Sequence, residues 1–178
     1  AKPAAKQAID DALKAKNDAI DANNDLTDEE KAKAKEDAKA KADAAKQAID
    51  NATTNDAVEQ AKNDGATSIS SVTPTPTAKP AAKQAIDDAL KAKNDAIDSN
   101  NDLTAEEKAK AKEDAKAKAD AAKQAIDNAT TNDAVTQAKN AGATSVDSVT
   151  PTPVVKPAAK QAIDDALKAK NDAIDANN

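Results

Sequence analysis

The sequence predicts an all-α fold, with tandem antiparallel three-helix bundles joined end to end into an elongated rod. Three observations lead to this prediction. The 178 residues contain long runs rich in Ala and Lys, and such runs have high helix propensity. Within these runs, apolar residues recur every three or four positions, as on one face of a helix. The segment that begins at Lys2 also returns at Lys79 and again at Lys156, so the chain is internally repeated.

The repeat divides the chain into two full copies and the beginning of another. Residues 1–77 are expected to form the first three-helix repeat, with helices over about 3–23, 28–52 and 55–72. Residues 78–154 are expected to form the second, with helices over about 80–100, 105–129 and 132–149. Residues 155–178 correspond to the first helix of a truncated third repeat.

The first helix of each repeat opens with a proline. Pro3 suits the first turn of a helix, where the backbone N–H that proline lacks would have no partner. The face of this helix that is expected to point inward is mostly apolar but includes Lys16, whose aliphatic stem is expected to lie along the core. The helix is expected to end at Asn23-Asn24-Asp25. The stripe consists of Ala5, Ile9, Ala12, Leu13, Lys16 and Ile20.

The second helix begins with a capping box. Thr27 and Glu30 have the spacing in which each side chain caps the backbone N–H of the other, and Leu26 precedes them as a hydrophobic staple. The apolar stripe behind this cap is narrow and almost entirely alanine, so the helix needs close neighbours. Its members are Ala34, Ala38, Ala42, Ala45, Ile49 and Ala52.

The third helix contains a glycine on its apolar face. Gly65 lies in phase with Val58 and Ile69, and Gly142 has the same place in the second copy. One interpretation is a helix that stops at the glycine. The other, which we favour, is a continuous helix in which glycine allows close backbone approach, because the stripe keeps its phase as far as Val72.

Each repeat ends in a proline-rich linker, over residues 73–80 and 150–157. Alternating proline forbids helix and favours an extended, semi-rigid spacer. The Thr-Pro segments are either plain spacers, which we favour, or acceptors of O-linked glycans. The copies are expected to fold independently. The last helix is expected either to dock on a bundle or to extend from the linker, since a lone helix is marginal in water.

The composition argues against most catalytic and binding chemistry. The net charge is −6, and the sequence has no His, Cys, Met, Arg or aromatic residue. These absences remove the usual proton shuttle, thiolate ligands and stacking platforms, and no apolar run is long enough to span a membrane. We therefore expect no enzyme activity, no catalytic, cofactor-binding or metal residues, no cofactor, no nucleic-acid partner and no membrane insertion.

Two acidic segments resemble the start of a calcium loop. They are Asp21–Asp25 and Asp98–Asp102. The pattern then fails, because leucine occupies the glycine position and alanine replaces the bidentate glutamate. We interpret both segments as polar turns. The paired carboxylates Asp10-Asp11 and Glu29-Glu30 are interpreted as solvated helix faces.

Two motifs and the glycine in the third helix resemble the DUF1542 repeat. The motifs are Asn51–Val58 and Asp25–Lys31. Such repeats occur in cell-wall-anchored surface proteins of Gram-positive bacteria. The resemblance implies an extracellular, cell-surface location and a helical region between an adhesive head and a wall anchor. It supplies no catalytic residues.

These observations favour a structural function. We expect a stalk or spacer that projects an adhesive head domain away from the cell wall. The alternative is a binding module for a host plasma or matrix protein, although no exposed aromatic hot spot is present. The expected partners are neighbouring repeats of the same chain, with host proteins contacted through other domains, and the chain is expected to be a monomer.

Overall fold

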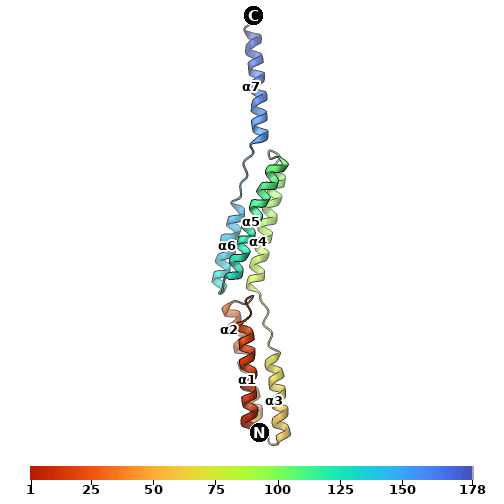
Figure 1. Ribbon diagram of the computed structural model, residues 1–178, viewed down its shortest axis with the longest axis vertical. Coiled ribbons are helices and arrows are strands. Elements are labelled where there is room, and N and C mark those ends of the chain that lie inside the picture. The colour runs from red at the N-terminus through yellow and green to blue at the C-terminus, as the bar shows by residue number, and fades with distance from the viewer. Residues whose placement is uncertain (178) are drawn as a thin grey trace. The chain divides into compact units, whose positions relative to one another are not determined.

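The computed structural model describes residues 1–177 and consists of helices joined by turns and linkers (Figure 1). The prediction of an all-α fold is confirmed, with no strand among these residues. Asn178, the last residue of the predicted third repeat, lies outside the described residues. The helices are α1 (Lys2–Asp21), α2 (Asp28–Asn51), α3 (Asn55–Ser70), α4 (Ala78–Ser99), α5 (Ala105–Asn128), α6 (Asn132–Asp147) and α7 (Val155–Asp175).

The chain divides into two compact units, and their boundary does not follow the sequence repeat. The first unit combines residues Ala1–Ala82 with Ile126–Gln137. It therefore contains α1 to α3, the linker, the beginning of α4, and the turn between α5 and α6. The second unit contains the remaining described residues.

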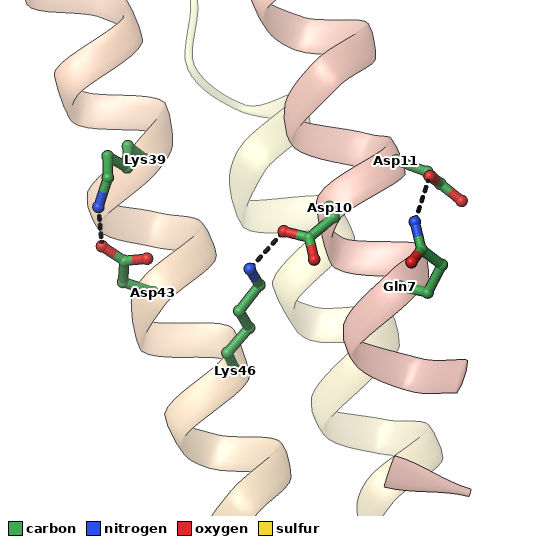
Figure 2. A network of polar contacts seen from close by, with 6 residues as sticks. All are labelled: Gln7, Asp10, Asp11, Lys39, Asp43 and Lys46. Atoms are coloured by element: carbon green, nitrogen blue, oxygen red, sulfur yellow. Dashed lines mark hydrogen bonds and ion pairs between the residues drawn. The ribbon is translucent and has the colours of Figure 1, made fainter. Parts of the chain in front are cut away.

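In the first unit, α1, α2 and α3 pack against one another as a three-helix bundle. Lys46, in the second half of α2, pairs with Asp10 near the middle of α1, as Figure 2 shows, and Lys35, in the first half of α2, pairs with Asp21 at the end of α1. These two pairs make α1 and α2 antiparallel. Lys16 Nζ donates to the carbonyl oxygen of Val72 at 3.0 Å, so the end of α3 lies beside the later part of α1.

The core of this bundle follows the predicted stripes. Ile9, Ile49 and Ile69 are completely buried, and Leu13 is half-buried against the same cluster. The alanine stripe of α2 is buried from Ala34 to Ala45. Because alanine side chains are small, the neighbouring helices can approach α2 closely while burying only a modest apolar area.

Gly65 lies inside a continuous α3, so the preferred interpretation of this residue agrees with the structure. A Cβ atom added to Gly65 would lie 2.8 Å from Ile9 Cδ1 and still closer to Ala45 Cβ. Gly142 has the same surroundings in α6, where an added Cβ would lie 3.0 Å from Ile86 Cδ1. Neither glycine has a positive φ angle, so the backbone conformation does not require glycine at these positions. Glycine is needed because a side chain would collide with the neighbouring helices.

The second unit repeats this packing with α4, α5 and α6. Ile97, Leu103 and Val149 form a buried cluster with the alanine stripe of α5. Lys112 of α5 lies 2.5 Å from Asp98 at the end of α4, and Lys123 pairs with Asp87 near the middle of α4. These contacts match those of α1 and α2, so near-identical sequences make near-identical bundles.

The last helix, α7, remains unpacked along its length. It has the same sequence as α1 from the lysine before its proline onward, yet Ile163 is 68% exposed whereas its counterpart Ile9 is completely buried. Only its first turns have partners elsewhere: Lys156 Nζ donates to the Asn101 carbonyl at 2.7 Å, and Lys160 lies 3.7 Å from Asp102. Of the two outcomes considered for this segment, the structure has the helix extending from its linker.

Candidate functional site

The candidate functional site lies where three turns of the first compact unit meet. We call this place the junction; it comprises residues 24–31 at the start of α2, the linker and first residues of α4 over 71–79, and residues 127–132 between α5 and α6. All belong to the first unit. The junction lies where the first repeat is connected to the second.

Glu30 caps two helices with one carboxylate. Its Oε2 atom accepts from Thr27 N at 3.0 Å, which completes the predicted capping box of α2. Its Oε1 atom accepts from Thr77 N at 3.0 Å, from Thr77 Oγ1 at 2.6 Å and from Ala78 N at 3.1 Å. The bonds from Thr77 N and Ala78 N supply acceptors for backbone N–H groups at the start of α4. The linker is thereby fastened to α2.

This second cap changes where α4 begins. The proline at position 80 suits the first turn of a helix, so the sequence predicts a start at about that residue. The helix instead begins at Ala78, two residues earlier. The Glu30 carboxylate satisfies the N–H groups at this point, and this favours an earlier start. No local signal in residues 73–80 identifies Glu30 as their partner.

The hydrogen bonds also change the acidity of Glu30. Partial burial alone would raise its pKa, but the hydrogen bonds from Thr77 Oγ1 and from the backbone of Thr27, Thr77 and Ala78 outweigh this effect. They lower the pKa from 4.5 to about 2. Glu30 therefore accepts all of these bonds as a carboxylate at neutral pH.

Lys79 is the buried charge of the junction. Only 4% of the surface of Lys79 is exposed. The Nζ atom donates to the Asn24 carbonyl at 2.8 Å and to the Asp127 carbonyl at 2.7 Å. Asp127 is in the last turn of α5, where carbonyl groups lack intrahelical partners and a positive charge is favoured. One ammonium group thus joins the α1–α2 turn to the end of α5.

The turn between α5 and α6 makes two further bonds in the junction. Asp28 N donates to the Thr130 carbonyl at 2.7 Å. Glu29 Oε2 accepts from Asn132 N at 3.0 Å, at the first residue of α6. Thr27, which directly precedes Asp28 in the chain, is completely buried. Adjacent residues of one turn therefore present a donor and an acceptor to the same neighbouring turn.

The second copy repeats the linker clamp. Glu107 Oε1 accepts from Val154 N at 2.9 Å and from Val155 N at 3.2 Å. The pKa of Glu107 is lowered by the backbone hydrogen bonds from Thr104 and Val154, which outweigh the opposing effect of desolvation. A clamp that occurs at both linkers belongs to the repeat itself and is not an accident of one position.

The acidic segments singled out in the sequence serve turns and helix pairs. Asn23 Oδ1 accepts from Asp25 N at 3.0 Å, and Asn100 makes the same bond with Asp102. Such a bond is typical of a polar turn. Among residues 1–177, no group of three or more His, Cys, Asp or Glu side chains is placed to hold a metal ion. None of the helices described is long and apolar enough to cross a membrane.

A shallow groove runs between α2 and the linker. Ala34, Asp37 and Lys41 line one side, and Val72 and Pro74 line the other. A groove with the corresponding residues lies beside α5. The mixture of small apolar groups with charges of both signs makes these grooves the candidate surfaces for a binding function.

Comparison with known proteins identifies the repeat. The family model described as Domain of Unknown Function (DUF1542) matches residues 1–77 and again residues 78–154. The chain belongs to the DUF1542 family. The earlier resemblance is therefore confirmed, and the matched ranges cover most of this DUF1542 chain.

The relatives of this DUF1542 chain are much longer proteins. It is 34% identical over 177 residues to "Extracellular matrix-binding protein EbhA" of Staphylococcus aureus strain Newman, which covers 99% of the chain and 5% of that protein. It is 34% identical over 142 residues to "Extracellular matrix-binding protein ebh" of strain MRSA252, covering 80% of the chain and 1% of that protein. No solved structure matches. The DUF1542 chain is therefore a repeat segment of the kind found in extracellular surface proteins.

Proposed function

We propose that this DUF1542 chain is a stalk or spacer that projects an adhesive head domain away from the cell wall. We also propose that residues 1–77 and 78–154 are its full repeats and that 155–178 begin a third. The proposal includes no catalytic, cofactor or metal site. The observation that carries it is the opposite placement of the two ends of a bundle.

The chain enters the first bundle at one end and leaves it at the other. Residues 1–3 lie beside the α2–α3 turn over residues 52–55. The carbonyls of Ser70 and Val72, where α3 ends, instead accept from Lys16 in the later part of α1. A repeat added at such an exit lengthens the molecule. With 1.5 Å per residue and a short linker, each repeat adds on the order of 40 Å.

The junction supports a stiff connection. The linker is bonded to α2 through Glu30, and Lys79 bonds both Asn24 and Asp127. A freely jointed linker of glycine and serine would make no such contacts. The proline residues of the linker add intrinsic stiffness. These features suit a spacer that holds its length.

Small-angle X-ray scattering tests the proposal directly. A compact globule of this size has a radius of gyration of about 16 Å. Two bundles in line with a terminal helix are expected to give about 30 Å and a rod-like profile. A radius of gyration near the globular value would contradict the stalk.

The names of the relatives favour a second candidate function. Both relatives are described as matrix-binding proteins. If the repeats themselves bind matrix, the grooves beside α2 and α5 are the surfaces to examine. Immobilised matrix extract should then bind the chain saturably below about 1 µM. The charge reversals Lys41→Glu and Lys118→Glu together should weaken that binding at least tenfold. An undiminished signal would remove the grooves from consideration.

A further inference from the structure

We infer that the α1–α2 turn of each repeat is a docking surface for the α2–α3 turn of the following repeat, and that Lys79 couples the folding of the two. The inference rests on the proposed spacer function and names what joins its parts. A repeat that is stabilised by the next one resists local unfolding at the joint. This expectation replaces the independent folding that the short linker alone suggests.

The docking surface and its occupant are complementary group by group. The α1–α2 turn of the first repeat offers the Asp28 N–H as a donor, and the Asn24 carbonyl and the Glu29 carboxylate as acceptors. The second repeat offers the Thr130 carbonyl to this donor, and the Lys79 ammonium and the Asn132 N–H to the two acceptors. Lys79 also donates to the Asp127 carbonyl within its own repeat, which holds the ammonium beside the docked turn. Three bonds of mixed polarity favour this position of the turn, because a shift along the chain would separate these donors from their acceptors.

The second copy of the surface shows the same groups without that occupant. Lys156 Nζ donates to the Asn101 carbonyl at 2.7 Å, as Lys79 does to Asn24. Lys156, however, is exposed, whereas Lys79 is 4% exposed. Likewise Thr104 is half-buried, whereas Thr27 is completely buried. The docked turn therefore accounts for the burial, and the second surface offers its groups to the matching turn of a third repeat.

Burial makes Lys79 the residue on which the coupling depends. An ammonium group loses hydration when it is buried and must be compensated by close acceptors. The two carbonyls supply that compensation only while the end of α5 is folded and docked. If the second repeat unfolds, Asp127 no longer holds the Lys79 ammonium against Asn24, and the cover over Thr27 is lost. The first repeat then loses stability without any change to its own core.

Hydrogen exchange on the full chain tests the coupling. Ile97 is buried in the second repeat and is remote from the junction contacts, so Ile97→Asp is chosen to unfold that repeat. Exchange is read in the α2 helix of the first repeat. The peptides that report on α2 must include Asp28. The residues that follow Asp28 in α2 are identical to those that follow Ala105 in α5, so only this position distinguishes the two helices. Val146→Asp serves if the second repeat stays protected in Ile97→Asp.

We expect unfolding of the second repeat to lower the protection of α2 at least tenfold. In a Lys79→Met background, the same unfolding should change α2 protection by less than about twofold. Lys156→Met is the matched control, because its ammonium bonds a single turn, and it should preserve the tenfold effect. Unchanged α2 protection in Ile97→Asp would overturn the inference. Small-angle scattering tests the spacer function separately. A rod-like profile would still support the spacer function if the exchange experiment failed, and a globular profile would contradict it whatever the exchange result.

Discussion

Glu30 contributes to two helix caps that are far apart in the sequence. Its bond to Thr27 spans three residues, and the sequence motif predicts it. Its bonds to Thr77 span 47 residues, and no motif identifies them. The same carboxylate therefore begins α2 and holds the linker that begins α4. Its low pKa reflects the number of donors around it.

This arrangement predicts a specific loss of stability in acid. The pKa of Glu30 is lowered to about 2, so the contribution of its charge is present at neutral pH and is lost as pH falls from about 4.5 to about 2. Glu30→Gln, which keeps the side-chain shape, should cost about 0.5–1 kcal/mol at pH 7, and this cost should shrink as pH falls towards 2, where Glu30 becomes protonated in the folded state. Circular dichroism melts across this range measure the difference.

Glu36→Gln is the matched control for this measurement. Glu36 is exposed on the same helix and should give the wild-type melting temperature throughout the series. A constant difference between Glu30→Gln and the wild type from pH 7 to pH 2 would show that the carboxylate charge is not what fastens the linker.

At the level of the helix, one sequence occurs in three environments. The segments that begin at Lys2, Lys79 and Lys156 are nearly identical, and all three are helical. Ile9 and Ile86 are completely buried in two of them, whereas Ile163 is exposed in the third. Helix formation follows from local propensity and the proline at the first turn. Burial depends on whether two further helices are present.

A pair of substitutions measures this difference. Ile86→Ala should destabilise the second repeat by about 2–5 kcal/mol, because it removes a buried side chain and leaves a cavity. Ile163→Ala changes the same residue in the same local sequence but should alter stability by no more than about 0.5 kcal/mol. Urea denaturation followed by circular dichroism gives both values. A comparable cost at Ile163 would mean that α7 is packed in solution.

At the level of the whole molecule, the compact units differ from the repeats. The first of the two family matches ends at residue 77, whereas the first compact unit continues to residue 82 and also contains residues 126–137. Sequence repeats mark how the chain is duplicated. Compact units mark which residues contact one another. The difference between them is the set of contacts on which the proposed joint depends.

The prolines of the linker are expected to maintain the length of the molecule. Pro74→Gly combined with Pro76→Gly should reduce the radius of gyration by about 10–20%, because glycine gives the linker more conformations. Small-angle scattering measures the change, and Pro3→Gly, outside the linker, is the control. An unchanged radius would mean that the Glu30 and Lys79 contacts alone hold the joint.

The sequence by itself determined the helices, the capping box, the buried stripes and the linkers. Each depends on residues within a few positions of one another, where helical spacing and backbone preference decide the outcome. The second cap at Glu30 and the burial of Lys79 were decided by the tertiary structure alone. Their partners lie 47 to 55 residues away, and Glu29 meets Asn132 across 103 residues. Local periodicity carries no information at such distances, because only packing brings these groups together.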